Sequence, residues 1–223
     1  MQSLPVSPWR ESLKLARATL RNRYESNRNI DVLLRDTAAL TDKTLSDLWQ
    51  AVAMPADAAL IAVGGYGRRQ LFPYSDIDIL ILLPETHDNT LQKKAEELIG
   101  LCWDVGLEIG HSVRTQIECL EESARDLTVQ TALLEARLLS GEARQFASLH
   151  QALHAAMDPS AFLEAELLEQ QQRHARFHGV AYNLEPNIKE SPGGLRDLQT
   201  IGWISQACGL GASWNELDRK SVV

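Results

Sequence analysis

Two aspartates separated by one residue are the clearest chemical feature of the chain. Asp76 and Asp78 alternate with Ile77 and Ile79 at the start of an apolar run. Side chains of a β-strand alternate between its faces, so the two carboxylates share one face, with backbones roughly 6.6 Å apart. Carboxylates in this arrangement bind divalent cations such as Mg²⁺, and a pair of such ions serves phosphoryl transfer. The spacing predicts a metal-dependent phosphoryl-transfer site.

A glycine-rich turn precedes the aspartates. Gly64 and Gly65 follow an apolar run at 58–63, and without Cβ atoms they let the main chain approach a phosphate and present N–H groups to it. Arg68 can add a charge-assisted contact, while Ser75 either binds a phosphate or serves as a turn residue. The lysine of a P-loop and the third glycine of a dinucleotide fingerprint are absent. We therefore expect a nucleoside triphosphate as the substrate.

An Asp-x-Asp pair alone is a weak signal, and both aspartates could be solvated residues at a strand entrance. A calcium loop is excluded, because Leu80 and Leu82 stand where oxygen ligands would be needed. The glycine pair upstream and the apolar strand on each side favour a catalytic site. The pattern thus supports phosphoryl transfer without naming the acceptor.

Composition limits the class of protein. The chain has 223 residues, 44% of them hydrophobic and 23% charged, which is typical of a globular protein with one large domain or one domain and an extension. A net charge of −8 argues against general nucleic-acid binding. No apolar run reaches the roughly 18 residues of a membrane span, and three widely spaced cysteines predict neither disulfides nor a zinc site. We expect a cytoplasmic protein.

The apolar periodicity predicts an α/β (α+β) fold, in which a small sheet is covered by helices. The expected elements are two amphipathic helices within 9–53, strands at 58–63, 76–83 and 107–114, a helix at 90–105, mostly helical structure at 117–179 and a final helix at about 195–207. Asp76 and Asp78 then lie on the second of the three predicted strands.

Three blocks resemble a known family. The pair at 64–65 together with Ser-Asp-Ile-Asp at 75–78 is similar to the signature of the polymerase-β-type nucleotidyltransferase superfamily. Within it, Gly-Gly-Tyr-Gly-Arg at 64–68 and Pro-Tyr-Ser-Asp-Ile-Asp at 73–78 resemble the family of bacterial PII uridylyltransferases. Blocks at 110–115 and 183–201 resemble the same family. One departure is Arg69-Gln70, where the family more usually has Gly-Glu.

The resemblance implies a domain order and a site. It implies N-terminal helices at 1–55, a nucleotidyltransferase core with a small mixed sheet at 56–127, and a helical extension at 128–223. Asp76 and Asp78 would bind two Mg²⁺ ions, for which Mn²⁺ can substitute. Glu108 is the expected third carboxylate, or else a solvated strand residue. Lys189 and Arg196 are either nucleotide contacts or surface charges near a helix start.

The resemblance also implies an activity, which is transfer of UMP from UTP to a tyrosine of the PII nitrogen-regulatory signal protein. The family continues into an HD phosphohydrolase domain and two ACT domains, so we expect a fragment without uridylyl removal, on which glutamine acts only through those domains. Two alternatives stay open. One is an enzyme like glutamine synthetase adenylyltransferase, which uses ATP, and the other is a nucleotide-binding regulatory module without turnover.

Overall fold

The structure of the chain is a computed structural model that describes residues 6–177, 187–211 and 216. Its residues group into two compact units, unit 1 at Met1–Gln151 and unit 2 at Ala152–Val223. In chain order the elements are α1 (Ser7–Asn27), α2 (Ile30–Ala51), β1 (Ala59–Ala62), α3 (Gly64–Gly67), β2 (Ile77–Leu83), α4 (Asn89–Val105), β3 (Ile109–Thr115), α5 (Gln116–Arg125), α6 (Leu127–Leu134), β4 (Arg137–Gly141), α7 (Ala143–Ala156), α8 (Pro159–Arg176) and α9 (Leu195–Ala207).

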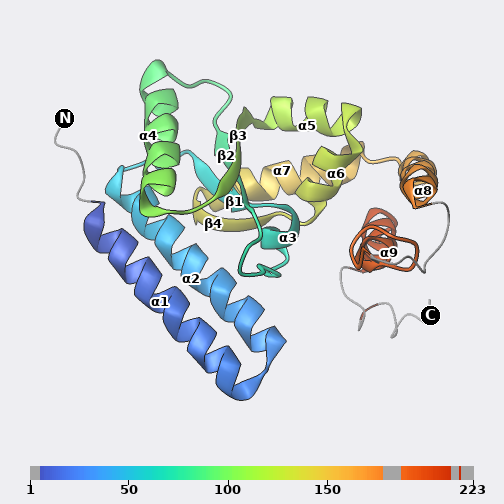
Figure 1. Ribbon diagram of the computed structural model, residues 1–223. Helices are drawn as coiled ribbons and strands as arrows, with labels where there is room; N and C mark the ends of the chain where they lie inside the picture. Colours follow the sequence, from blue (N-terminus) through green and yellow to red (C-terminus); the bar gives the residue numbers. More distant parts are fainter. Residues whose placement is uncertain (1–5, 178–186, 212–215, 217–223) are drawn as a thin grey trace. The chain divides into compact units, whose positions relative to one another are not determined.

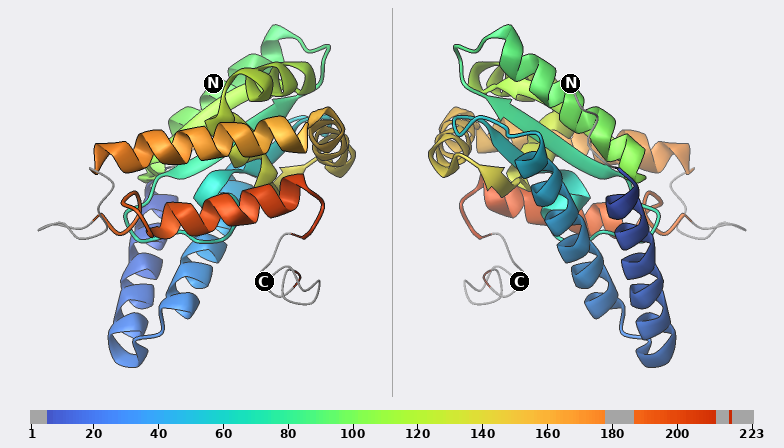
Figure 2. Two further views of the ribbon diagram at one scale, coloured as in Figure 1. Left: turned by 90° about the vertical axis from the view of Figure 1, so that its right-hand side faces the viewer. Right: turned by 90° about the vertical axis from the view of Figure 1, so that its left-hand side faces the viewer.

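The two amphipathic helices predicted at the N-terminus are confirmed as α1 and α2, which run side by side as a hairpin (Figure 2). Pro8 lies in the first turn of α1, where its missing N–H costs no helical hydrogen bond. The side chain of Asn29 accepts a hydrogen bond from the N–H of Val32 (3.1 Å) and so begins α2. The apolar face of α2, including Leu45 and Leu48, is buried. This face fixes the hairpin against the core.

A four-stranded mixed sheet in the order β3-β2-β1-β4 forms the centre of unit 1 (Figure 1). β1 is antiparallel to β2 and β4, whereas β2 is parallel to β3. A parallel pair needs a crossover connection, and α4 supplies it. Gly106 ends α4 in the left-handed conformation (φ +94°) and turns the chain toward β3. The small mixed sheet and the α+β class predicted from sequence are confirmed.

The fourth strand was not predicted. Residues 137–141 lie within the segment expected to be mostly helical, yet they form β4 and pair with β1. Leu138 and Leu139 are flanked by too few alternating residues to give a strand signal, so the pairing partner decides the conformation. A Cβ at Gly141 would collide with the backbone of Ala58, which explains the glycine at this end. The sheet therefore extends beyond residue 127, where the predicted core region stopped.

The two faces of β2 have different neighbours. Ile77, Ile79 and Ile81 belong to the apolar core that also contains the inward faces of α2 and α4. Because side chains alternate along a strand, Asp78 lies on the opposite face, together with the buried Leu80. Within the described part of the chain, every helix is too short or too polar to cross a membrane.

Candidate functional site

Asp76 and Asp78 lie where β2 begins, at one edge of the sheet. Asp78 is the second residue of the strand and is partly buried, whereas Asp76 is exposed and immediately precedes the strand. The neighbouring Ile77 and Ile79 are buried in the core. The alternation predicted from sequence therefore holds in the fold, and the two aspartates share a face.

Two glycines flank the carboxylate of Asp78. Gly110 is its partner in the register of β2 and β3, and a Cβ at Gly110 would collide with Oδ1 of Asp78. On the other side, the Cβ position of Gly64 lies 3.7 Å from Oδ2 of Asp78, and Gly64 has φ +57°, which favours glycine. The sequence singled out Gly110 only as part of a family block. Its role is to leave room for the carboxylate.

Glu108 immediately precedes β3, on the flank of β2 away from β1. The N–H of Ile77 donates to the carbonyl of Glu108 (3.0 Å), which places Glu108 beside the start of β2. The side chain of Glu108 is exposed. Among the described residues, no group of three or more acidic, histidine or cysteine side chains is gathered closely enough to hold a metal. The structure thus brings Glu108 near the aspartates without assembling a three-carboxylate set, and its role as third carboxylate stays a prediction.

The glycine turn forms a single helical turn, α3. Tyr66 and Gly67 are buried, and a Cβ at Gly67 would collide with the carbonyl oxygen of Glu135. Arg68, expected to contact a triphosphate, forms an ion pair with the buried Glu135 and donates from Nε to Gln70 (3.0 Å). The position of Arg68 is thereby set by the protein itself.

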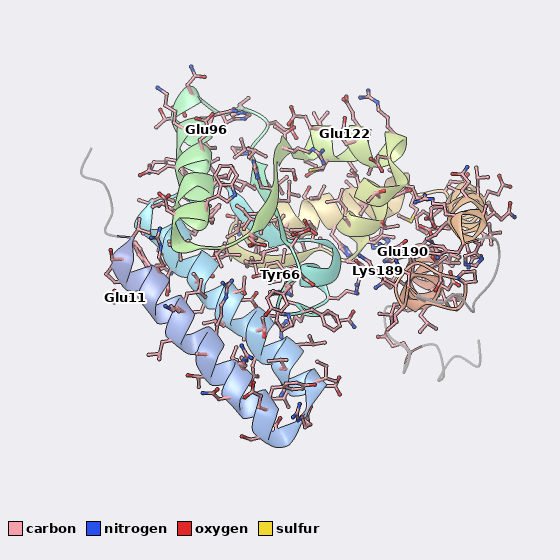
Figure 3. The ribbon with its side chains drawn as sticks, viewed as in Figure 1. Glu11, Tyr66, Glu96, Glu122, Lys189 and Glu190 are labelled. Carbon is pink, nitrogen blue, oxygen red and sulfur yellow. The ribbon has the colours of Figure 1, made fainter. Side chains whose placement is uncertain are left out.

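A polar cluster attaches α3 to α2 and β4. The hydroxyl of Tyr66 donates to Oδ1 of Asp42 (2.7 Å), and Arg137 donates to both oxygens of Asp42 (2.8 and 3.0 Å). Nε of Arg137 also donates to the carbonyl of Gly67 (3.2 Å). Burial, together with the hydrogen bond to Asp42, raises the pKa of Tyr66 far above its usual range. Tyr66, labelled in Figure 3, is therefore a neutral packing residue.

Asp42, Glu135 and Arg137 are functional candidates that the sequence analysis missed. Each contacts the glycine turn from far along the chain. No spacing rule connects position 42 with positions near 136, because the packing of α2 and the pairing of β1 with β4 bring them together only in the folded chain. They act by holding the turn in place beside Asp78.

Ser75, expected to bind a phosphate or shape a turn, is exposed directly before Asp76. Its N–H donates to the carbonyl of Phe72 (3.0 Å), which closes a turn over 72–75. This observation supports the turn role and leaves phosphate contact as a prediction.

The block at 183–201 lies in unit 2, and its first four residues fall outside the described ones. Gly194 is the N-cap of α9, and Gly193 has φ +76°. The N–H of Gly193 donates to Asp197 (2.7 Å), and Arg173, which is 1% exposed, donates to the same carboxylate (2.9 Å). Burial alone would raise the pKa of Asp197, but these hydrogen bonds outweigh it and lower the pKa to about 2.

Lys189 and Arg196 belong to this second unit, so their surroundings are described within that unit alone. The guanidinium of Arg196 lies 5.3 Å from the ring centroid of Trp203 and donates to Gln199 (3.1 Å). Lys189 is exposed, and its N–H donates to the side chain of Asn187 (3.0 Å). Nucleotide contact by either side chain stays a prediction, and the glycine turn beside them has the role of a helix start.

The side chains at the edge of β2 fit a magnesium ion in their chemistry. Mg²⁺ is bound through one or two carboxylates, while substrate phosphates and waters complete its six oxygen ligands. Asp76 and Asp78 provide two carboxylates on one face, and Gly110 leaves the space that the second of them needs. The absence of a third carboxylate in the set is compatible with this mode of binding.

Two family models match separate parts of the chain. A family model described as "Nucleotidyltransferase domain" matches residues 42–139, and one described as "GlnD PII-uridylyltransferase" matches residues 161–223. The first range contains Asp42, both aspartates of β2, Glu135 and Arg137. The chain therefore contains a nucleotidyltransferase domain, followed by a segment typical of PII uridylyltransferases.

Curated relatives match along the whole chain. The bifunctional uridylyltransferase/uridylyl-removing enzyme of Nitrosospira multiformis is 53% identical over 234 residues, which is 100% of this chain and 26% of the relative. The enzyme of the same name from Chromobacterium violaceum is 51% identical, over 100% of this chain and 26% of its own length. The chain thus spans about a quarter of the length of these relatives.

Among solved structures, a mutant of the MntA-HpeT toxin–antitoxin aligns with a TM-score of 0.32 and 14% identity, over 63% of this chain and 98% of that chain. The sequence matches are far stronger than this structural one. By its two family matches and its similarity to curated enzymes along its entire length, the chain contains a nucleotidyltransferase domain and is similar to bacterial PII uridylyltransferases.

Proposed function

We propose that the chain transfers UMP from UTP to a tyrosine of the PII nitrogen-regulatory signal protein, in the cytoplasm and with Mg²⁺ as cofactor. The observation that carries this proposal is the edge of β2, where Asp76 and Asp78 share a face and Gly64 and Gly110 flank the second carboxylate. The names of the curated relatives support uridylyl transfer. UTP, PII and magnesium are the parts of the proposal that need experiment.

Each residue at this edge has a separate role in the proposed reaction. Asp76 and Asp78 would hold Mg²⁺, which supplies charge neutralisation at the phosphates and lowers the pKa of the attacking hydroxyl. The main chain at Gly64 and Gly65 would lie against the triphosphate, because neither residue has a side chain to obstruct it. Arg68 would act from a position that its ion pair with Glu135 fixes, rather than as a mobile contact. The acceptor tyrosine must then approach the α-phosphate from the side opposite the leaving pyrophosphate.

The proposed acceptor is a separate protein, and the proposed regulation belongs to other parts of the longer relatives. PII is proposed as acceptor because the family's name and the block at 183–201 indicate it. Removal of the uridylyl group and the response to glutamine are proposed for other parts of the longer relatives, since the chain matches only about a quarter of their length. We propose no role for nucleic acid or a membrane.

The direct test is to incubate the chain with PII, MgCl₂ and either UTP or ATP, and to measure the mass of PII. The proposal predicts a mass increase of one UMP per modified tyrosine with UTP and none with ATP. A gain of AMP instead would favour an adenylyltransferase. Nucleotide binding without any mass change on PII would favour a regulatory module. Chelation of Mg²⁺ with EDTA should abolish the transfer, and added MnCl₂ should restore it.

A further inference from the structure

A large cleft lies in unit 1 beside the strand edge that carries Asp76. It has a volume of about 700 Å³ and lies between the α1–α2 hairpin and the loop at 71–75. At the strand edge it is lined by Ser75 and Glu108. A second hollow shares Glu108 with it and is lined by Asp76 and Gly110. The cleft therefore leads from the helical hairpin to the carboxylates.

One wall of the cleft is basic although the chain as a whole is acidic. Arg17, Arg21 and Arg28 line it; the first two are four residues apart on one side of α1, and Arg28 is the residue that caps the end of this helix. Arg17 donates to the carbonyl of Gly106 (3.3 Å), and the guanidinium of Arg28 lies 5.9 Å from the ring centroid of Tyr24. These two contacts are with neutral groups, so both positive charges remain available to an anionic ligand. Arg21 is paired with Glu25 at the surface.

The opposite wall carries exposed aromatic side chains. Tyr74 is 95% exposed and Phe72 is 46% exposed, and both line the cleft. Exposed aromatic residues beside arginines are typical of the central contacts of protein–protein interfaces. The combination fits a protein segment that has both an aromatic and an acidic character.

The end of the cleft at Glu108 and the glycine turn lie on opposite flanks of β2. The glycine turn follows β1, which is one neighbour of β2, whereas Glu108 precedes β3, which is the other. The phosphates of a nucleotide are proposed to lie at the glycine turn, and in phosphoryl transfer the attacking and leaving oxygens are roughly in line. The attacking group should therefore arrive from the flank of β3, where the cleft ends. Gly64, Gly65 and Arg68 do not line the cleft.

We propose that this cleft binds the acceptor protein, and specifically a segment in which the modified tyrosine is accompanied by acidic side chains. The inference rests on the proposed function, because it takes PII as the acceptor. The arginines of α1 would meet the acidic side chains, Tyr74 and Phe72 would pack against the segment, and the tyrosine hydroxyl would extend past Glu108 toward Asp76. The bond formed joins the tyrosine oxygen to the α-phosphorus of UTP, the bond broken releases pyrophosphate, and the hydroxyl proton passes to a nearby base or to water.

The test uses the double variant Arg21→Glu, Arg28→Glu in the full chain, with Arg35→Glu as the matched control. Arg35 is also exposed and belongs to α2, but it does not line the cleft. We expect the KM for PII to rise roughly tenfold or more, because two attractive contacts become repulsive. The KM for UTP and the rate at saturating PII should change little. Arg21→Lys, Arg28→Lys should retain most of the affinity, and the circular dichroism of all variants should match the original chain.

Binding is measured separately from transfer, by titrating labelled PII and following fluorescence anisotropy. If the original chain transfers UMP and the charge-reversed variant keeps its KM for PII, the cleft is not the acceptor site although the proposed function stands. A rise in the KM for UTP alone would assign the cleft to the nucleotide and overturn the inference. If PII binds, and binds more weakly to the charge-reversed variant, but receives no UMP, the cleft inference survives and the proposed function fails. If PII neither binds nor is modified, both are wrong.

Discussion

The chain has two glycine turns in its family blocks, and they are held in different ways. The turn at Gly64–Gly67 depends on partners that are distant in sequence, since Asp42 precedes it by more than twenty residues and Arg137 follows it by seventy. The turn at Gly193 is held mainly by its own surroundings, which are Asn187, Asp197 and the preceding helix α8. The first turn lies beside the carboxylate of Asp78, whereas the second begins a helix.

This difference shows how much of a segment's function can be inferred from its sequence motif alone. Both blocks combine glycines with charged residues, and both resemble the same family. In unit 2, Arg173 and Asp197 form an ion pair with each other. These two charges therefore contribute to the stability of the fold. In unit 1 the polar cluster lies behind the turn and leaves Asp76 exposed at the edge of the sheet. A turn that the protein anchors on one side leaves its other side accessible to a substrate.

The largest effect on stability is expected at the second turn, for Arg173→Met. Arg173 is 1% exposed and contacts Glu169, Asp197 and the carbonyl of Glu190. Its removal takes the shared cation away from the partly buried carboxylates of Asp197 and Glu169, which costs about 3–5 kcal/mol. Hydrogen exchange of residues 187–211, measured by mass spectrometry, should accelerate strongly. The exposed Arg176 of the same helix is the matched control, and equal effects of Arg173→Met and Arg176→Met would contradict the account of this cluster.

The next largest effect is on catalysis, for Gly110→Ala. The added Cβ would collide with Oδ1 of Asp78 and displace the carboxylate. A displacement of this kind can reduce the transfer rate by about 100-fold. Initial rates at saturating UTP and PII measure the effect. Gly100→Ala has open space around its Cβ and should keep full activity, and a fully active Gly110→Ala would show that the position of Asp78 is not critical.

A smaller effect, on the pH dependence of stability, is expected from Glu166, a buried residue of α8 that faces α9. Thr200 donates to its Oε2 (3.3 Å), while Oε1 has no hydrogen-bond partner among the described residues. Burial raises the pKa of Glu166 to about 7, from a usual value of 4.5. A raised pKa in the folded state stabilises the protein below pH 4.5, and this stabilisation is lost as the pH rises through 7.

Unit 2 should therefore lose roughly 3 kcal/mol between pH 4.5 and 7.5, and Glu166→Gln should remove this slope. Urea unfolding at several pH values measures it, with the exposed Glu164→Gln as control. The lowered pKa of Asp197 acts only at lower pH, because its stabilisation is present above pH 4 and is lost as the pH falls toward 2. A slope that persists in Glu166→Gln would assign the pH dependence to another group.

The smallest effect on stability is expected for Arg137→Met at the first turn. Its ion pair with Asp42 is partly exposed, with 19% and 25% of the two side chains accessible, so the loss should be about 1–2 kcal/mol. Transfer should also slow, because the tether from Arg137 to the carbonyl of Gly67 is removed. Thermal unfolding and initial rates check both parts. A variant that is destabilised but fully active would separate this cluster from the positioning of the turn.

Much of this site could be predicted from sequence, because its chemistry is local. The alternation of Asp76 and Asp78 with two isoleucines specifies a strand and a shared face, and the glycine pair indicates a close backbone approach. The helical hairpin was predictable from its apolar periodicity. The strand at 137–141 was not, since its conformation depends on pairing with β1. Asp42, Glu135 and Arg137 could not be found for the same reason, because their contacts with the turn exist only in the folded sheet.

The central claim is that the edge of β2 is the site of nucleotidyl transfer. The most direct test is the rate of UMP transfer to PII by Asp76→Asn and Asp78→Asn, followed by mass spectrometry, with the exposed Asp57→Asn as control. We predict a loss of at least about 1,000-fold for each variant, because Mg²⁺ contributes several kcal/mol at the transition state, with an unchanged circular dichroism spectrum and full activity in the control. Transfer by either variant at a rate within tenfold of the original chain would contradict the account.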